Sequence, residues 1–273
     1  DQAPRRGPGR RPHVTEPAGG RERLGAIDVG SNSIRLLVAE HDPATGLEVI
    51  DEVKDMPRLA RGIGATGALD EGAMEQAFEA LRRMKDVATR RGVTRLAAVA
   101  TSAMRDASNG PAFAERVRRE LGIPLQIIDA DREARLSWRS VAHHFPLAGT
   151  RTLIADIGGG SLELIGTVDG LVEVTTSLPL GAVRLTESHL PGERETRKEV
   201  AELRAHVRKV LKKALPWRDW LQASLIGSGG TFTNLARTAS GRRGQLGDAV
   251  HGTEVHTGEV EALLEWLSTK TTA

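Results

Sequence analysis

Residues 24–40 read LGAIDVGSNSIRLLVAE, and residues 153–166 read LIADIGGGSLELIG. Each stretch is an apolar strand that ends in an aspartate, followed by a tight loop of glycine and small polar residues and by a second apolar strand. Such a loop exposes several backbone N–H groups without a side chain in the way, and a nest of this kind binds anionic oxygens. An aspartate at the strand end can hold a metal ion or orient a water molecule. The repeat predicts two loops that face each other and hold a phosphate group.

The elements around these two stretches repeat in the same order. Strands are predicted over residues 24–29, 34–40, 47–53, 96–100 and 125–128, and again over 152–156, 162–168, 171–176 and 225–227. Helices are predicted over residues 70–90, 111–121, 132–143, 194–215 and 259–267, with a glycine-rich loop and a helix up to residue 237 after the last strand. This plan predicts two similar α/β domains with mixed sheets, over 24–147 and 148–273, and a ligand-binding cleft between them.

Composition limits the classes of function. The chain has 273 residues, of which 39% are hydrophobic but only 3% aromatic, so its core must consist of aliphatic residues. It has no cysteine, which excludes disulfides, thiolate zinc sites and cysteine nucleophiles. Residues 1–23 are rich in arginine, proline and glycine and are predicted to form a disordered basic tail. Because neither a signal peptide nor a membrane-spanning stretch is apparent, we expect a cytoplasmic protein that binds neither membranes nor specific nucleic-acid sequences.

The two loops supply the candidate phosphate-binding groups. The second loop has three consecutive glycines, whereas a hairpin turn needs only one or two, which indicates that something approaches its backbone closely. The residues expected to hold phosphate there are Asp28, Gly30, Ser31, Asn32 and Ser33 in the first loop and Gly158, Gly159, Gly160 and Ser161 in the second.

Two carboxylates flank the second loop. Asp156 ends one predicted strand and Glu163 lies on the next, so the pair could share a divalent cation. The alternative for Glu163 is a position facing solvent, because Leu162 and Leu164 would point inward if side chains alternate along the strand.

Two further segments contain polar residues suited to phosphate chemistry. Arg105, in ATSAMRDASN at residues 100–109, could bind phosphate with its guanidinium fork or form a structural ion pair with Asp106 or Glu133. Glu133, in DADREARL at residues 129–136, is a candidate general base. Spacing alone does not distinguish Glu133 from other glutamates, such as Glu115.

A third glycine-rich stretch, IGSGGTFTN at residues 226–234, combines a strand end, glycines and a helix start. Gly229, Gly230 and Thr231 would lie at the helix N-terminus, which favours an anion such as a phosphate. The stretch has no lysine of the kind found in a P-loop, and the G-x-G-x-x-G pattern does not occur, so a Walker-type NTPase and a dinucleotide-binding fold are not indicated.

Taken together, these segments resemble the exopolyphosphatase / guanosine pentaphosphate phosphohydrolase (Ppx/GppA) family of the actin–Hsp70–sugar kinase superfamily. The resemblance rests on AIDVGSNSIRLLVAE at 26–40, ATSAMRDASN at 100–109, EARL at 133–136, DIGGGSLELI at 156–165, SLPLGAVRLTE at 177–187 and IGSGGTFTNLA at 226–236. It implies two actin-like (ribonuclease H-like) domains with mixed sheets flanked by helices.

The resemblance also implies functional roles. Glu133 would be the catalytic base, Arg105 would contact phosphate, and Asp156 and Glu163 would help to bind the metal. The substrate would be inorganic polyphosphate or pppGpp, which loses its terminal phosphate with the help of Mg²⁺ or Mn²⁺, with K⁺ as a further cofactor. Since members of the family are often dimers, the resemblance is compatible with a homodimer.

This sequence departs from the family pattern in three places. Arg132 stands where an acidic residue usually precedes the base, Leu162 replaces a threonine, and family members continue beyond Ala273, so that we expect the second domain to be incomplete. Two other functions stay open: a small-molecule kinase of the same superfamily, and a sensor that binds polyphosphate or pppGpp without cleaving it. A basic helix face over residues 197–213 could line a channel for a long chain or simply face solvent.

Overall fold

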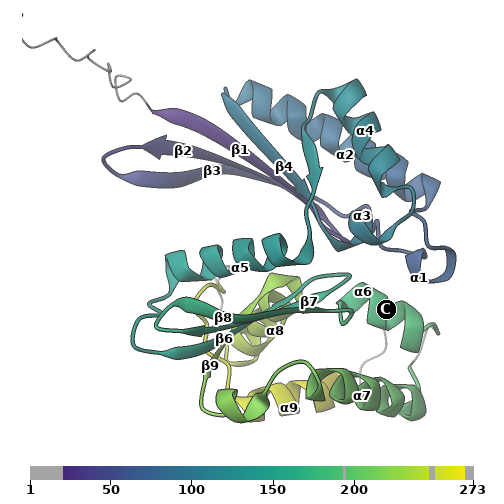
Figure 1. The fold of residues 1–273 in the computed structure, drawn as a ribbon, viewed down its shortest axis with the longest axis vertical. Coiled ribbons are helices and arrows are strands. Elements are labelled where there is room, and N and C mark those ends of the chain that lie inside the picture. Colours follow the sequence, from purple (N-terminus) through teal and green to yellow (C-terminus); the bar gives the residue numbers. More distant parts are fainter. Residues whose placement is uncertain (1–20, 193–194, 246–249, 268–273) are drawn as a thin grey trace, which may run out of the picture.

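The computed structural model describes residues 21–192, 195–245 and 250–267, and it contains two β-sheets with helices around and between them (Figure 1). The first sheet has five strands, in the spatial order β3 (Gly46–Asp55), β2 (Ile34–Asp42), β1 (Glu22–Val29), β4 (Arg95–Ala100) and β5 (Leu125–Ile127). The first three strands of the chain form an antiparallel meander, and β4 and β5 run parallel to β1. The sheet is therefore mixed, as the sequence predicted.

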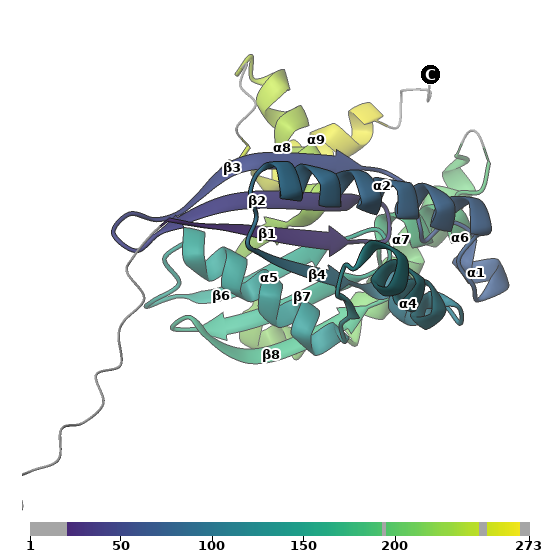
Figure 2. The same ribbon diagram turned by 90° about the horizontal axis from the view of Figure 1, so that it is seen from above.

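One face of the first sheet is buried under two amphipathic helices, α2 (Glu71–Arg90) and α4 (Gly110–Leu121) (Figure 2). Asp70 caps α2 by accepting a hydrogen bond from the backbone N–H of Ala73 at 2.9 Å, and Gly122 ends α4 at a φ of 65°. The short helices α1 (Ile63–Thr66) and α3 (Ser102–Asp106) lie in the connections. Because side chains alternate along β1, Ile27 and Val29 enter this core while Asp28 points to the opposite face.

The predicted tail over residues 1–23 falls mostly on residues 1–20, which lie outside the described residues. Its predicted end was wrong, since β1 already begins at Glu22. Glu22 pairs with His41 and Arg23 with Glu40 on the neighbouring strand, and Arg23 also donates a hydrogen bond to the carbonyl of Arg91 at 2.8 Å. These cross-strand contacts extend the strand further toward the N-terminus than its apolar residues indicated.

The second sheet repeats the strand order of the first. Among the described residues, its four strands lie in the order β8 (Leu171–Leu178), β7 (Leu162–Val168), β6 (Arg151–Ile157) and β9 (Ser224–Ser228). β6, β7 and β8 form an antiparallel meander, and β9 runs parallel to β6. Asp169 and Gly170 both have positive φ angles in the turn between β7 and β8, as predicted for that hairpin.

Both faces of the second sheet are covered, which explains its nearly continuous apolar strands. One face packs on α5 (Ala130–His144), which lies between the two sheets in Figure 1. The opposite face packs on α7 (Arg197–Lys212), on the 3₁₀ helix η1 (Trp217–Trp220) and on α8 (Gly229–Arg242). The helix α9 (Thr257–Leu267) packs on α8, and α6 (Ala182–His189) follows β8. None of the helices in the described ranges has both the length and the apolar character that crossing a membrane requires.

The short helices α1, α3 and α6 were not predicted, and three further details differ from the predicted elements. α7 starts at Arg197 rather than near residue 194, because Thr196 and Glu199 form a capping box there. The glycine-rich loop predicted after β9 is absent, since α8 begins at Gly229 directly after the strand and continues to Arg242. α5 packs on the second sheet, although it precedes the boundary that the sequence suggested between the halves.

Candidate active site

The two glycine loops of the repeat are in direct contact. A methyl group added at Gly160 would lie 2.4 Å from the Oγ of Ser102 and 2.6 Å from the Oγ of Ser31. One added at Gly159 would lie 3.0 Å from the Cβ of Ser31 and 3.1 Å from the backbone nitrogen of Asn32. The Ser31 and Ser102 hydroxyls form a 2.7 Å hydrogen bond at this contact. Glycine is therefore required for the two halves to meet this closely.

Both loops have the same local geometry. The backbone N–H of Gly30 donates to the carbonyl of Ser33 at 3.0 Å, and that of Gly158 donates to the carbonyl of Ser161 at the same distance. The chain after each meander then donates backbone N–H groups to the loop carbonyls, from residues 58 and 60 to the first loop and from residues 182 and 184 to the second. Within the described part of the chain, the N–H groups of Ser31 and Gly160 have no hydrogen-bond acceptor. These two backbone donors are therefore available at the junction to bind an anion.

The strand register places the acidic residues at the same junction. Asp156 is directly opposite Glu163 in the antiparallel pair of β6 and β7, so their side chains lie on one face of the sheet. In the first sheet the corresponding partner of Asp28 is Arg35, a basic residue. Glu163 is only 2% exposed, which rules out the solvent-facing position that alternation allowed.

Four carboxylates at the junction have raised pKa values. Loss of water raises the pKa of Glu163 to about 7, and repulsion by Glu133 adds to this shift. The pKa of Asp28 rises to about 6 because neighbouring protein atoms displace water around it and Glu133 and Asp156 repel its charge, although part of the side chain stays open to solvent. Burial also raises the pKa of Glu133 and of Asp156. Such a cluster binds protons or cations.

Arg105 and Glu133 form an ion pair in the middle of this cluster. The Nη1 of Arg105 lies 2.9 Å from the Oε2 of Glu133 and also donates to the carbonyl of Ile128 at 3.0 Å. The sequence suggested Asp106 or Glu133 as the ion-pair partner of Arg105, and the structure shows the pair with Glu133. Thr101 gives Glu133 a further hydrogen bond. α3 contributes the arginine and α5 the glutamate, so the pair joins an element of the first half to a helix packed on the second sheet.

Two serines that the sequence analysis did not single out bind these carboxylates. The Oγ of Ser137 donates to the Oδ2 of Asp156 at 2.5 Å, and the Oγ of Ser177 donates to the Oε1 of Glu163 at 2.8 Å. Ser137 lies four residues after Glu133 on α5, so the helical period could have placed it on the same side. Ser177 is opposite Glu163 in the register of β7 and β8, which the sequence alone did not determine.

The N-terminus of α8 lies beside the second loop. Ser228 is the parallel-strand partner of Asp156, and a methyl group at Gly229 would lie 2.6 Å from the Oδ1 of Asp156. Gly229 has a φ of +85°, a conformation that favours glycine. Gly230 and Thr231 form the first turn of the helix with it, so the three residues are near the junction, although not in the predicted loop.

Arg184 on α6 links the second loop to the first half, and the sequence analysis gave it no role. Its Nε donates to the carbonyl of Gly160 at 2.8 Å, and its guanidinium also forms an ion pair with Asp106 on α3. Nearby, Glu187 of the same helix accepts a hydrogen bond from the N–H of Gly62 at 3.1 Å. α6 therefore holds the two halves together next to the loop contact.

The donor set at the junction fits a magnesium ion. In the described residues no three histidine, aspartate or glutamate side chains converge on one point as a complete metal cage. Mg²⁺ does not need such a cage, because it is commonly bound by one or two carboxylates together with substrate phosphates and water. Asp156, which is half-buried, and Glu163, which is buried, lie on one face of the sheet and would supply the two carboxylates.

The two halves repeat one mixed sheet, each with a glycine loop at its first hairpin, and carboxylates lie where the loops meet. This arrangement defines the actin-like fold class that the sequence predicted. Comparison with known proteins agrees with this class. Among the solved structures that share the fold is a Ppx/GppA family protein of Aquifex aeolicus. It is 30% identical to this chain, with a TM-score of 0.73 over 92% of this chain and 80% of that one. Another is an exopolyphosphatase of Cytophaga hutchinsonii, which is 26% identical, with a TM-score of 0.84 over 92% of this chain and 81% of that one.

The sequence comparisons identify the family. Residues 37–273 match the profile of the Ppx/GppA phosphatase family, and the chain belongs to that family. It is 32% identical over 265 residues to exopolyphosphatase 1 of Mycobacterium tuberculosis, covering 91% of this chain and 73% of the relative. It is 34% identical over 240 residues to exopolyphosphatase 2 of the same organism, covering 84% and 74%.

The raised pKa of Glu163 gives the folding stability a definite pH dependence. Between pH 4.5 and about 7 the folded protein keeps a proton that the unfolded chain has released, so the free energy of unfolding should fall as the pH rises through this window. With divalent cations chelated, Glu163→Gln should therefore stabilise the protein at pH 8, by up to about 3 kcal/mol, and much less at pH 4.5. Urea unfolding at both pH values measures the difference. Glu173→Gln, at an exposed position of β8, is the control; equal effects of the two variants would contradict the prediction.

Proposed function

We propose that the protein is a metal-dependent phosphohydrolase that removes the terminal phosphate of inorganic polyphosphate. The observation that carries this proposal is the contact of the two glycine loops beside the Arg105–Glu133 pair, the half-buried Asp156 and the buried Glu163. The exopolyphosphatases among the relatives support polyphosphate as the substrate. The family also supports guanosine pentaphosphate, whose terminal phosphate has the same chemistry.

The loops and Arg105 would hold the terminal phosphate. Backbone N–H groups of Ser31 and Gly160 are donors without a partner in the described residues, and the hydroxyls of Ser31 and Ser102 lie between the loops. Arg105 would exchange part of its contact with Glu133 for a phosphate oxygen, which a guanidinium binds in a forked geometry. Most of the catalysis would come from positioning and charge stabilisation, as is usual for phosphoryl transfer.

Glu133 would act as the general base. Burial raises the pKa of Glu133, so it is a better proton acceptor than an exposed glutamate, and the hydrogen bond and charge of Arg105 oppose part of this rise. It would take a proton from the water that attacks the terminal phosphorus, as the bond to the bridging oxygen breaks and the shortened chain leaves. Mg²⁺ bound by Asp156 and Glu163 would supply charge neutralisation for the phosphate oxygens.

Phosphate release by the purified protein tests the proposal. Long-chain polyphosphate, tripolyphosphate and guanosine pentaphosphate are offered separately, each with Mg²⁺ and with a chelator. We expect Mg²⁺-dependent release of orthophosphate from polyphosphate without any added nucleotide. Release that requires ATP and an acceptor would instead indicate a kinase, and tight binding of polyphosphate without release would indicate a sensor.

Metal binding can be measured without turnover. At pH 8, saturating Mg²⁺ should raise the melting temperature of the wild-type protein, because a ligand at a hundred times its Kd stabilises by about 2.7 kcal/mol. Asp156→Asn should lose most of this stabilisation, since it removes one of two carboxylates. The exposed control Glu173→Gln should keep it. A Mg²⁺-induced shift of the same size in the Asp156 variant would argue against metal binding by this carboxylate.

A further inference from the structure

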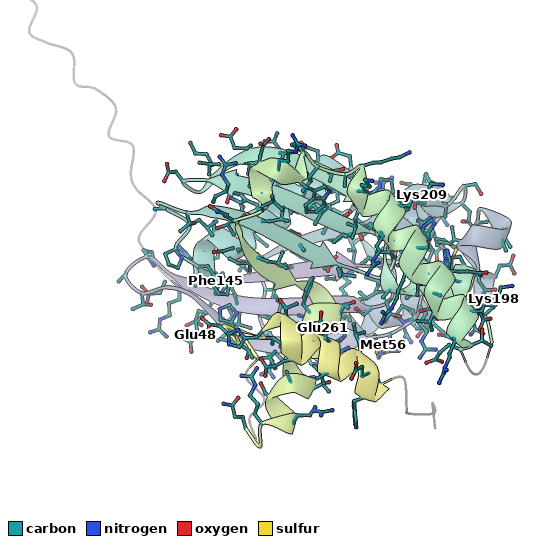
Figure 3. All side chains as sticks on the ribbon, turned by 90° about the horizontal axis from the view of Figure 1, so that it is seen from below. Glu48, Met56, Phe145, Lys198, Lys209 and Glu261 are labelled. Atoms are coloured by element: carbon teal, nitrogen blue, oxygen red, sulfur yellow. The ribbon has the colours of Figure 1, made fainter. Side chains whose placement is uncertain are left out.

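A groove with basic residues lies on the other face of the second sheet. A groove of about 390 Å³ runs between β8 and α7 and is lined by Thr176, Leu178, His206, Lys209, Val210, Lys213 and Ala214. This volume falls within the range of small-molecule sites, about 300–1,000 Å³. Figure 3 labels Lys209 on α7, which lies along the outer side of this sheet.

The groove is separate from the candidate active site. Side chains alternate along a strand, so Ser177, which binds Glu163 on the active-site face, points away from its neighbours Thr176 and Leu178. Leu178 packs with the hydrophobic cluster beneath α7, which lies on the opposite face. The groove lies on β8, the edge strand of the sheet, and the neighbouring strand β7 carries Glu163.

The charge in the groove is positive and is not neutralised. His206 and Lys209 of α7 and Lys213, the residue that caps its C-terminal end, follow each other at spacings of three and four residues and so lie on one side of the helix. None of the seven lining residues is acidic, and none of these three basic side chains has a carboxylate partner among the described residues. The acidic residues Glu199 and Glu202 of α7 are held elsewhere, in the capping box and in an ion pair with Lys198.

We propose that this groove binds an oligophosphate anion. Two ammonium groups, an imidazole and the hydroxyl of Thr176 supply hydrogen-bond donors, and the aliphatic side chains of Leu178, Val210 and Ala214 form the apolar part of the lining. Lysine is suited to a phosphate chain, because its flexible ammonium can follow repeated phosphate units as a point charge. The anion is either the distal part of a substrate chain that passes over the edge strand or a separate small phosphate compound.

The proposal is tested by binding rather than by turnover, so it does not depend on the proposed hydrolysis. Isothermal titration calorimetry without Mg²⁺ measures the Kd of long-chain polyphosphate and of tripolyphosphate for the wild-type protein and for the double variant Lys209→Glu, Lys213→Glu. The matched control is Arg208→Glu, Lys212→Glu, which changes the net charge equally on exposed residues of the same helix that do not line the groove. Thermal melting verifies that all three proteins are folded.

We expect the groove variant to bind at least one of the two anions about tenfold or more weakly, corresponding to about 1.4 kcal/mol, while the control changes far less. If the groove variant binds only the long chain more weakly, the groove holds the distal part of the substrate chain. If it also binds tripolyphosphate more weakly, the groove is an independent site for a small phosphate compound. Equal Kd values for the groove variant and the control, with both anions, would overturn the proposal. If the wild-type protein releases no phosphate in the assay above, the proposed function is disproved, but the Kd values measured here still test the groove.

Discussion

Glu133→Gln should lower the rate of phosphate release by about 10²–10⁴-fold, the usual contribution of a general base. The carboxamide has nearly the same shape and can still accept the hydrogen bond from Arg105, so the ion pair becomes a neutral contact without leaving a cavity. It cannot take up a proton from water at neutral pH. Because the loops and the two carboxylates proposed to bind Mg²⁺ are untouched, the affinity for polyphosphate should stay near that of the wild-type protein.

Initial rates and calorimetric binding in the same buffer measure the two quantities separately. The matched control is Asp131→Asn, which lies two residues earlier on α5 and pairs with the exposed Arg135 at 2.8 Å. Surface ion pairs contribute about 0–1 kcal/mol to stability, so this variant should keep both its fold and its turnover. A Glu133 variant that turns over at the wild-type rate would remove this residue from the mechanism.

Gly160→Ala should have the second large effect. The new methyl group would lie 2.4 Å from the Oγ of Ser102 and 2.6 Å from that of Ser31, so both hydroxyls and the loops that carry them must move apart. Overpacking of this kind costs about 1–3 kcal/mol. A displacement near 1 Å at a reacting centre can lower the rate about 10²-fold. We therefore expect lower stability and a much lower rate of phosphate release together.

Gly158 provides the control within the same loop. A methyl group there would meet only the carbonyl oxygen of Ser161, at 3.7 Å, an ordinary van der Waals distance, and neither glycine has a positive φ. Gly158→Ala should change the free energy of unfolding by less than about 1 kcal/mol. Chemical denaturation and rate measurements on both variants make the comparison. Similar stability losses in the two would show that the loop contact is less tight than described.

Much of the fold could be predicted because local signals agreed with each other. The apolar spacing of residues 70–90, with Asp70 before it, predicted α2, and Gly122 marked the end of α4. The position of α5 could not be predicted, since an apolar stripe shows that a helix packs but not on which sheet. The eight-residue helix α6 was missed because a short segment after a strand has too little periodicity to be distinguished from a loop.

For the site, the sequence indicated the right segments but not the contacts between them. The repeated loops and Asp156 could be found because spacing and residue type are local properties. The contact of Gly160 with Ser102 depends on how two sheets pack, as does the link from Arg184 to Asp106. The solvent-facing alternative for Glu163 was wrong for the same reason, because alternation along the strand does not show that a further layer such as α5 covers that face.

The two halves are alike in outline but opposite in charge at one equivalent position. Arg35 faces Asp28 across the first hairpin, whereas Glu163 faces Asp156 across the second. Arg35 also pairs with Glu52 at 3.2 Å, whereas Glu163 adds a second carboxylate beside Asp156. The phosphate chain that we propose as the substrate would therefore meet unlike surroundings at the two loops. The first loop would accept its anionic oxygens directly, and the second would need a cation between its carboxylates and the phosphate.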